Sequence, residues 1–503
     1  MSLTVPGRVS RTAGNWREGP AAWPPGTRSW YAAAVSLIFA ANVMFSRYLF
    51  ADSLFDLYAG RYIVRHHWVP HGNVFTAEAH GASWVDQQWL AHVLYYGAWA
   101  VGGYRLLALF SAVLVTSGFA LLALIMLRRG VPATRMFAWT LAAFGVCMGN
   151  TGIRAQSFGY PCLAVILWLI LADDGAPRLR ARTWLVIPVL VVWANTHGSV
   201  LLGSALVVLY AGYRAARALA RGDSGELPAC LGLAAAAAAA VLCTPYGTGV
   251  ISYYARFAGN PVLASNIVEW SRPTPLDPFS WAFFALVLAT AIAVAIGWRR
   301  GVRPDPLLAG LALVMLALAL SAVRNQAWFA FGGSLLAADT LARGRRGQVP
   351  VLGRAFRQVL VGLLATTALV SICVLAVTPT SQFESEMPQR AMGAAVAMAV
   401  RDPVLRVLGD DWSGTPMLWL YPAMVGRVGF DIRLEQYSSR QLNEYIDFLF
   451  AHPGWQRVMR GYSIVVVSRR EHPRLAADLE RVPGWRIVYR DRDGLVLERR
   501  GIA

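Results

Sequence analysis

Long apolar stretches separated by short polar segments occupy most of the chain up to residue 378. They lie at residues 30–50, 87–101, 105–127, 134–150, 157–173, 183–213, 228–244, 279–298, 305–322, 326–341 and 358–378. A helix that crosses a bilayer needs about 20 residues, with a range of about 17–25. The pattern therefore predicts an all-α polytopic membrane bundle. The stretch 183–213 is too long for one span and is interrupted by polar residues at 195–198, so we interpret it as two short spans.

The stretch 87–101 decides the topology, because it can either cross the membrane or lie along its surface. If it lies on the surface, the arginine-rich loops between the other spans all fall on one side, as the positive-inside rule requires of cytoplasmic loops. These arginines are Arg128, Arg129 and Arg135; Arg178, Arg180 and Arg182; Arg214, Arg217 and Arg221; Arg299, Arg300 and Arg303; and Arg343, Arg345 and Arg346. We therefore predict about eleven spans, with a cytoplasmic N-terminus and an extracytoplasmic C-terminal region.

The same pattern predicts the domain organisation. Residues 1–29 form a cytoplasmic N-terminal tail, and residues 30–378 form the transmembrane domain, whose first outer loop covers residues 51–104. Residues 379–503 are polar, and short apolar strands at 464–467, 486–489 and 495–498 alternate there with helical patterns. We expect this last region to be a small soluble α/β domain outside the membrane.

Composition narrows the class of protein further. Of the 503 residues 56% are hydrophobic and 15% are charged, whereas soluble globular proteins carry about 25% charged residues. This excludes a disordered chain and an ordinary cytosolic enzyme. In so apolar a chain the formal net charge of +18 does not indicate nucleic acid, and we predict membrane lipids as partners and no nucleic acid. The five cysteines all lie in apolar stretches, which argues against a disulfide framework.

The predicted outer face carries most of the unusual polar residues beside the membrane. They are Asp52, Asp56, Asn150, Arg154, Gln156, Asn195, His197, Tyr246, Glu269, Arg324 and Gln326, whereas we expect the inner loops to hold little beyond arginine. Polar groups at membrane depth are costly and tend to be functional. The working face is therefore expected to be the extracytoplasmic one.

Asp52 and Asp56 directly follow the first apolar stretch and lie four residues apart. On a helix this spacing places both carboxylates on one face, where their repulsion makes one of them hold its proton more tightly. Such a pair can act as a general base or bind a divalent metal ion. The alternative interpretation is two acidic residues that are exposed at the water interface.

Other outer residues suggest binding roles. Arg154 and Arg324 lie at the outer ends of spans, where a guanidinium can grip phosphate oxygens in a bidentate fork, or else contact lipid headgroups. His197 follows Asn195 at the helix break, where both a site residue and a hydrogen-bonded structural histidine fit the pattern. Glu269, in the loop 245–278, is a candidate for binding a sugar hydroxyl.

Four histidines of the first outer loop are candidate metal ligands. His66, His67, His71 and His80 lie close together in the first outer loop, but no second ligand pair at a diagnostic spacing accompanies them. We therefore predict no metal site. The chain contains no Gly-rich phosphate loop, no CxxC pair and no GxSxG elbow.

The first outer loop resembles that of the GT-C superfamily, in a bacterial GT-C-like group with a DPDLWWHL-type motif. The similar segments after Asp52 are Gly60–Ile63, Val69–His71, Phe75–Thr76, Gly81, Trp84–Leu90, Trp193–Gly198, Thr244–Gly247, Glu269–Trp270, Arg324 and Asp431–Tyr437. GT-C proteins are membrane glycosyltransferases that use polyprenyl-phosphate sugar donors, such as the protein O-mannosyltransferases and the aminoarabinose transferases of lipid A. The first acidic position of the motif is Phe50 in this chain, which argues against metal binding by the motif.

The resemblance implies a glycosyltransferase in the bacterial plasma (inner) membrane. It would move a sugar from a polyprenyl-phosphate donor to a hydroxyl of an envelope glycan, lipid or protein by an inverting displacement, with Asp52 as the base. No cofactor is required by this scheme, and a divalent cation remains an open option. The expected site residues are catalytic Asp52 and Asp56, donor-phosphate-binding Arg154 and Arg324, and substrate-binding Asn195, His197, Tyr246, Glu269 and Gln326.

Two other functions remain alternatives. The first is a transporter or flippase of lipid-linked sugars, although charged residues gather at one face here and not along a path through the membrane. The second is a non-catalytic GT-C-like scaffold, which Phe50 in place of an acidic residue favours. Labelling of engineered cysteines at both faces would identify a transporter, and a sugar-transfer assay with Asp52→Asn would identify a scaffold.

Overall fold

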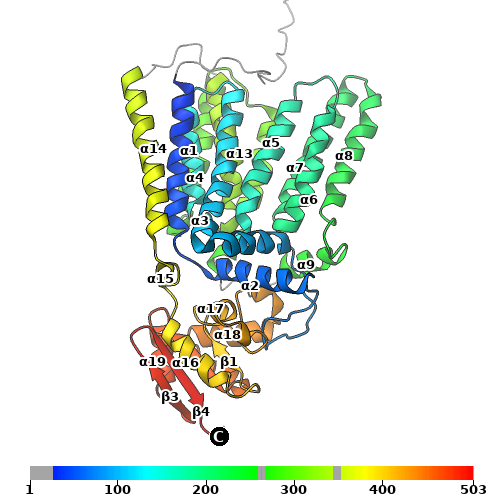
Figure 1. Cartoon of the computed structure of the whole chain (residues 1–503). Coiled ribbons are helices and arrows are strands. Elements are labelled where there is room, and N and C mark those ends of the chain that lie inside the picture. Colours follow the sequence, from blue (N-terminus) through cyan, green and yellow to red (C-terminus); the bar gives the residue numbers. More distant parts are fainter. Residues whose placement is uncertain (1–25, 259–261, 263–266, 344–352, 502–503) are drawn as a thin grey trace, which may run out of the picture.

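The computed structural model describes residues 26–258, 262, 267–343 and 353–501, so most of the expected N-terminal tail lies outside the described residues. Upright helices form one bundle (Figure 1). Within the described residues, one helix occupies each of the eleven predicted spans: α1 (Thr27–Phe45), α3 (Trp89–Arg128), α4 (Ala133–Cys147), α5 (Gly159–Asp173), α6 (Val186–Thr196), α7 (Val200–Ala220), α8 (Leu227–Ala240), α11 (Trp281–Arg299), α12 (Pro306–Ala319), α13 (Gln326–Arg343) and α14 (Arg354–Val377).

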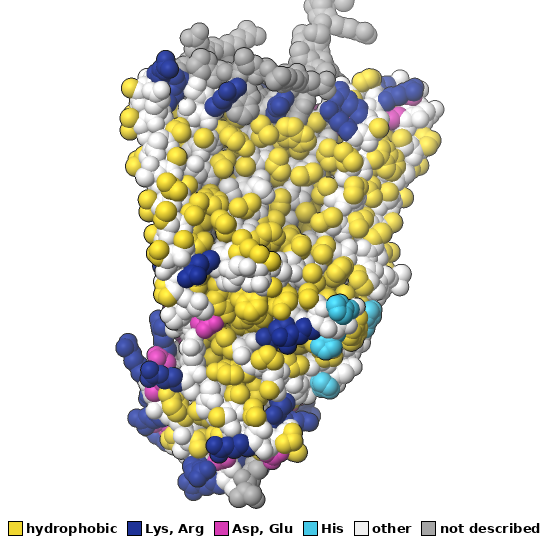
Figure 2. Space-filling view, viewed as in Figure 1, with side chains coloured by type: hydrophobic (Ala, Val, Ile, Leu, Met, Phe, Trp, Pro, Cys, Tyr) yellow, Lys and Arg dark blue, Asp and Glu magenta, His cyan; other side chains and the backbone are white. Residues whose placement is uncertain are grey.

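The surface of the bundle is that of a membrane protein. Figure 2 shows hydrophobic side chains over its middle, with arginine side chains along the end where the chain begins. By length and composition, five helical segments of the described chain can each cross a bilayer: Trp89–Arg128, Ala155–Asp173, Val200–Ala220, Pro278–Arg299 and Arg354–Val377. The remaining helices of the bundle are shorter or less apolar and lie beside these segments.

The arginine-rich end of the bundle also contains buried aspartates, whereas we expected its loops to hold little beyond arginine. Arg129 is buried and donates to Asp339 and Asp305, at 2.7 Å each. Arg343 pairs with the same two carboxylates at 3.0 Å. The expectation was wrong because these aspartates lie within apolar stretches, and a buried arginine needs a carboxylate partner.

The stretch 87–101 is not a separate span. It forms the first part of α3, which lies across the lower end of the bundle above α2 (Ala51–His66) in Figure 1. The helix bends at Gly102 and Gly103, and Gly103 has φ 63° and ψ −160°. Only glycine adopts this backbone conformation readily. The bend turns α3 from a direction across the end of the bundle to one along the bundle (Figure 1). The position of residues 87–101 at the membrane surface stays a prediction.

The predicted break in 183–213 is also present. Helix α6 ends at Thr196, His197 is extended with φ −165°, and α7 begins at Val200. A short helix α9 (Gly249–Ala258) follows α8 at the same end of the bundle as α2 (Figure 1).

The C-terminal region contains a small mixed sheet with helices. Its elements are α15 (Thr380–Phe383), α16 (Gln389–Ala399), β1 (Val407–Gly409), α17 (Gly414–Leu420), α18 (Ser439–Leu449), β2 (Ile464–Ser468), α19 (Pro473–Leu479), β3 (Trp485–Arg490) and β4 (Gly494–Arg499). The strand order is β1-β2-β4-β3, with β1 parallel to β2 and the other neighbours antiparallel. The α/β class and three strands are as predicted, whereas the three-residue β1 was too short to be recognised.

This C-terminal region packs against the first outer loop. Val407 and Trp419 belong to the same hydrophobic core as Tyr58 and Phe75 of the loop. Arg433, which is buried, donates to Asn73 Oδ1 at 2.8 Å and lies 4.5 Å from the centre of the Trp84 ring. Independent folding of residues 379–503 stays a prediction, but the region has a large contact with the loop that carries the two aspartates.

Candidate active site

Helix α2 brings Asp52 and Asp56 to the end of the bundle opposite its arginine-rich end (Figure 1). Asp52 lies in its first turn, where free backbone N–H groups favour a negative charge. Ser53 accepts a hydrogen bond from the Phe50 N–H at 3.3 Å and donates one to the Ile153 carbonyl at 2.7 Å. The start of α2 is thereby tied to the loop that carries the next residue, Arg154.

Arg154 lies between two carboxylates from different segments. Its Nη2 is 2.6 Å from Asp52 Oδ2, and its Nη1 is 3.1 Å from Glu269 Oε1. The Tyr95 hydroxyl donates to the Arg154 carbonyl at 3.0 Å and fixes its backbone. Partial burial opposes ionisation of Glu269, but the guanidinium outweighs it and holds the pKa of Glu269 below its usual value. Arg154 is therefore neutralised on both sides.

Arg324 has a different environment. It lies in a short turn, Val323–Asn325, between α12 and α13, and its guanidinium is 4.1 Å from the centre of the Trp270 ring. Its Nη2 is 3.5 Å from His197 Nε2. Among the described residues no carboxylate pairs with Arg324, so its positive charge is available to an anionic ligand.

His197 lies at the break between α6 and α7 and faces Arg324. The Ser199 N–H donates to His197 Nδ1 at 3.1 Å, and Ser199 Oγ lies 2.7 Å from the same nitrogen. Burial, and then Arg324 and Arg154, lower the pKa of His197 well below its usual value. Arg324 therefore lies beside a neutral imidazole.

Asp56 is held by a buried group that the sequence analysis did not identify. Its Oδ1 is 2.7 Å from His92 Nδ1, and His92 Nε2 is 3.1 Å from Asp86 Oδ1. Gly60 allows this contact, since a side chain there would overlap the His92 carbonyl. Burial raises the pKa of Asp56 to about 6, although the hydrogen bond with His92 opposes the shift. The signal available in the sequence was a histidine and an aspartate at the start of the surface helix.

These groups line a common small pocket of about 40 Å³. Its lining residues are Asp52, Asp56, Gln88, Arg154, Ala155, Gln156, His197 and Arg324. Both predicted aspartates, both predicted arginines and His197 are thus together, and Glu269 contacts Arg154. The volume accommodates a few water molecules. A sugar phosphate can enter only if the ion pairs around Arg154 rearrange.

Four predicted substrate-binding residues do not line this pocket: Glu269, which pairs with Arg154, and three residues with other partners. Asn195 donates to the Val191 and Cys243 carbonyls at 2.8 Å and accepts from Trp89 Nε1 at 2.7 Å. The Tyr246 hydroxyl donates to the Pro70 carbonyl at 2.9 Å. The Gln326 amide donates to Ser280 at 2.8 Å. These contacts favour structural roles, whereas Gln88 and Gln156 supply the amide groups of the pocket.

The donor set of the pocket does not match a divalent cation. Asp52 already has Arg154 as its cationic partner, and Asp56 has His92. The described residues bring no third metal-ligating side chain to these two carboxylates. A cation at this place would have to displace Arg154.

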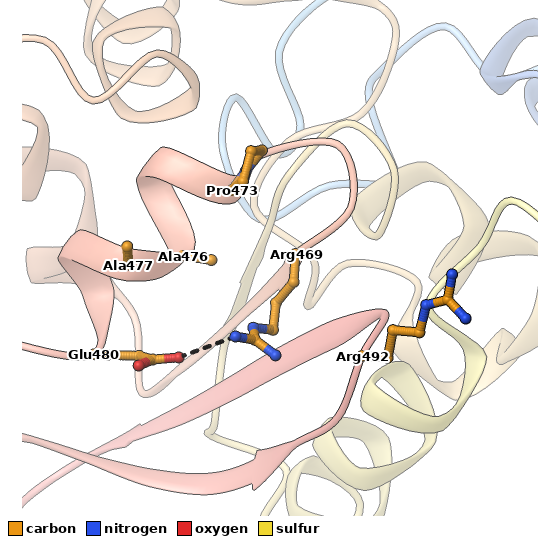
Figure 3. A pocket seen from close by; sticks show the side chains of 6 residues that line it. All are labelled: Arg469, Pro473, Ala476, Ala477, Glu480 and Arg492. Atoms are coloured by element: carbon orange, nitrogen blue, oxygen red, sulfur yellow. Dashed lines mark ion pairs between the residues drawn. The ribbon is translucent and has the colours of Figure 1, made fainter.

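A larger hollow of about 280 Å³ lies in the C-terminal region, against α19 (Figure 3). Its lining residues are Arg469, Pro473, Ala476, Ala477, Glu480 and Arg492. Arg469 points toward Glu480, with 3.7 Å between the charged atoms, whereas Arg492 points away from that pair. This hollow holds one carboxylate, already paired, and is a poorer candidate for acid–base chemistry than the pocket beside α2.

The chain is similar to known proteins in its three-dimensional structure. No family model and no curated protein matches the sequence. An arabinofuranosyltransferase from mycobacteria has 15% identity and a TM-score of 0.51 over 94% of this chain, which spans 40% of that protein's length. ArnT from Cupriavidus metallidurans, solved with bound undecaprenyl phosphate, has 14% identity and a TM-score of 0.50 over 93% of this chain and 97% of its own.

The oligosaccharyltransferase of Archaeoglobus fulgidus has 13% identity and a TM-score of 0.51, with 88% of this chain and 70% of its own covered. All three proteins are GT-C superfamily glycosyltransferases. At such low identity the likeness is one of fold, and it agrees with the bundle, the surface helix and the small C-terminal sheet described above. The chain therefore has the fold of the GT-C superfamily of membrane glycosyltransferases.

Proposed function

We propose that the protein is an integral-membrane glycosyltransferase that moves a sugar from a polyprenyl-phosphate donor to a hydroxyl of an envelope acceptor. One observation carries the proposal: two arginines, two aspartates and a neutral histidine from four segments of the chain line one pocket at the end of an apolar bundle. Cationic groups beside carboxylates suit a reaction in which a phosphate leaves and a hydroxyl loses a proton.

Arg324 is the first contact for the donor phosphate in this scheme. It has no carboxylate partner among the described residues, and the neutral imidazole of His197 lies beside it as a second polar group that can contact the phosphate. A phosphate bound there lies next to Arg154, whose two carboxylate partners it would partly displace. Charge-assisted hydrogen bonds from a guanidinium to phosphate are among the stronger interactions available in proteins.

This displacement would couple donor binding to activation of the base. While Arg154 is paired with Asp52 at 2.6 Å, the guanidinium occupies the carboxylate oxygen that would meet an acceptor hydroxyl. When Arg154 turns to the phosphate, this oxygen of Asp52 becomes free to accept the hydroxyl proton. Donor binding thus prepares Asp52 for catalysis.

The chemical step is a single displacement. The acceptor oxygen attacks the anomeric carbon while Asp52 takes the hydroxyl proton, and the bond from that carbon to the phosphate oxygen breaks. The polyprenyl phosphate leaves as an anion that Arg324 and Arg154 stabilise, and the anomeric configuration inverts. The envelope acceptor places the reaction at the extracytoplasmic face of a bacterial plasma membrane in this proposal.

The test is a transfer assay with purified full-length protein and a panel of undecaprenyl-phosphate-linked pentoses and hexoses. We expect Asp52→Asn to lower the transfer rate by about 10²–10⁴-fold, since a positioned general base is lost. The folding of the variant should be preserved, because Asp52 is 39% exposed. Glu444→Gln, which removes an exposed partner of Arg440 on α18, is the matched control and should leave the rate unchanged.

Two results would contradict the scheme. Near-normal transfer by Asp52→Asn would remove Asp52 from the mechanism and leave Asp56 or Glu269 as the base. Absence of transfer by the folded wild-type protein with every donor, in cell membranes as well as in detergent, would favour the non-catalytic scaffold or the flippase.

A further inference from the structure

A second cluster of ligating side chains lies in the C-terminal region, away from the pocket beside α2. Asp410 and Asp411 directly follow β1, and His472 follows β2 just before α19. One ligand atom from each of the three residues lies within 4.8 Å of the others. Strands β1 and β2 are parallel neighbours, so their carboxyl ends meet at the same edge of the sheet, which is where open α/β sheets bind ligands.

Asp410 is the buried member of the cluster. Its side chain is 0% exposed, and its Oδ2 accepts a hydrogen bond from the Ser468 N–H at 2.6 Å. The Ser413 hydroxyl lies beside this carboxylate, but the buried second oxygen, Oδ1, makes no hydrogen bond of normal geometry with any described residue. A buried carboxylate oxygen without a partner is costly, and a bound cation would satisfy it.

The charges around the cluster are unbalanced. Asp411 Oδ1 is 2.7 Å from His472 Nε2, and Asp411 is 45% exposed. In a chain with 46 basic and 28 acidic residues, the buried carboxylates of the bundle pair with arginine, yet among the described residues no arginine pairs with Asp410 or Asp411. Two adjacent carboxylates therefore share one imidazole.

We propose that Asp410, Asp411 and His472 form a binding site for a divalent transition-metal ion, with zinc as the best match. One imidazole nitrogen with two carboxylates is a donor set that zinc accepts, whereas magnesium prefers oxygen ligands alone. Ligands at about 2.0–2.2 Å around a tetrahedral zinc ion lie about 3.3 Å apart, so a small separation of His472 from Asp411 would admit the ion. The exposed side of Asp411 leaves a path for entry and a position for water.

The metal would join two loops that only hydrogen bonds now connect. The first loop leads from β1 into α17, whose last carbonyls, those of Leu418 and Trp419, accept hydrogen bonds from Arg61 of α2 at 2.7 Å. The second loop leads from β2 into α19. Metal binding should therefore raise the thermal stability of the C-terminal region and of its contact with α2.

The experiment uses full-length protein in detergent that is stripped with a chelator, desalted and titrated with zinc, and with cobalt as a spectroscopic probe. We expect one equivalent of zinc per chain by elemental analysis, a visible cobalt absorption that zinc abolishes, and a higher unfolding temperature with zinc. Asp411→Asn and His472→Gln should each weaken zinc binding by at least about 10–100-fold, the loss that even outer-shell substitutions cause. Asp411→Asn changes an exposed side chain, so its result stands even if His472→Gln unfolds.

A neighbouring pair serves as the matched control. His452 Nδ1 lies 3.4 Å from Asp447 Oδ1, and both residues are exposed in the same region. This pair has no third ligand, so His452→Gln and Asp447→Asn should bind zinc as the wild type does. The proposal is overturned if the wild-type protein binds no zinc, or if zinc binding is the same in Asp411→Asn as in the wild type, which would assign it to the histidines of the first loop.

Discussion

The two aspartates of α2 lie on the same helix, four residues apart, but they differ in their exposure to solvent and in the residues that they contact. Asp52 is partly exposed and paired with Arg154, whereas Asp56 is buried and contacts His92. Asp52 is therefore accessible from the pocket, whereas burial raises the pKa of Asp56 to about 6. In the proposed scheme Asp52 is the residue that meets the acceptor, and Asp56 tunes the charge of the pocket.

The pH dependence of transfer tests the role of Asp56. Its pKa of about 6 lies above the usual value, so we expect an acid limb near pH 6, where protonation removes the charge that supports Asp52. Asp56→Asn should lower the rate less than Asp52→Asn does and should move this limb to lower pH, as measured by kcat against pH. A limb that stays near pH 6 in the variant would assign it to another group.

The raised pKa of Asp56 also makes the stability of the folded protein depend on pH. Because folding raises the pKa of Asp56, its contribution to stability is complete below about pH 4 and is lost as the pH rises through about 6. Asp56→Asn should remove this part of the pH dependence, which can be measured by thermal unfolding at several pH values.

At the scale of residues, the sequence predicted which residue types belong to the site better than it predicted which of these residues contact one another. An aspartate pair after the first span and arginines at the ends of spans are visible along the chain, and the structure brings them into one pocket. The contact between Asp56 and His92 joins residues 36 positions apart. No spacing rule for a single helix predicts it.

At the scale of elements, the bend in α3 determines how the first outer loop meets the bundle. The first part of the helix lies under the bundle beside α2 and carries His92, and the second part runs along the bundle (Figure 1). Hydrophobicity alone does not separate these parts, because both are apolar. The arginines in the loops at the opposite end of the bundle distinguished the two parts. If both parts crossed the membrane, these loops would no longer satisfy the positive-inside rule.

The glycine at the bend provides a test of this arrangement. Gly103 has φ 63° and ψ −160°, so Gly103→Ala should destabilise the protein by about 1–3 kcal/mol, as measured by unfolding in detergent. Gly97→Ala in the first part of the same helix is the control, because its site is open and helical. It should be neutral or stabilising by about 0.5–1 kcal/mol. Equal effects of the two substitutions would mean that the bend is not under conformational constraint.

At the scale of the whole molecule, the two ends of the bundle have different chemistry. One end carries arginines, several of them paired with buried aspartates, and the other carries α2, the pocket and the C-terminal region (Figures 1 and 2). All the elements that line the pocket therefore face the same side of the membrane. A donor that stays in one leaflet would reach all of them together.

The orientation of the bundle can be measured with reporter fusions. Because arginine-rich loops remain cytoplasmic, a reporter that is active only outside the cytoplasm should work when fused after residue 380 and fail when fused near residues 130, 218 or 344. Activity at residue 130 would reverse the assignment of the arginine-rich end and would move the pocket to the cytoplasmic face.

The sequence by itself determined the membrane class, the positions of the helices, the break at His197 and three strands, predicted at 464–467, 486–489 and 495–498 and each one or two residues longer in the structure. These features depend on runs of neighbouring side chains, which hydrophobicity and periodicity record directly. Only the tertiary structure decided which polar residues meet. It paired Arg154 with Asp52 and Glu269, left Arg324 without a carboxylate, and turned Asn195 and Tyr246 to structural hydrogen bonds. Each of these outcomes depends on packing between distant segments, because burial and the nearest opposite charge determine what a polar side chain can do.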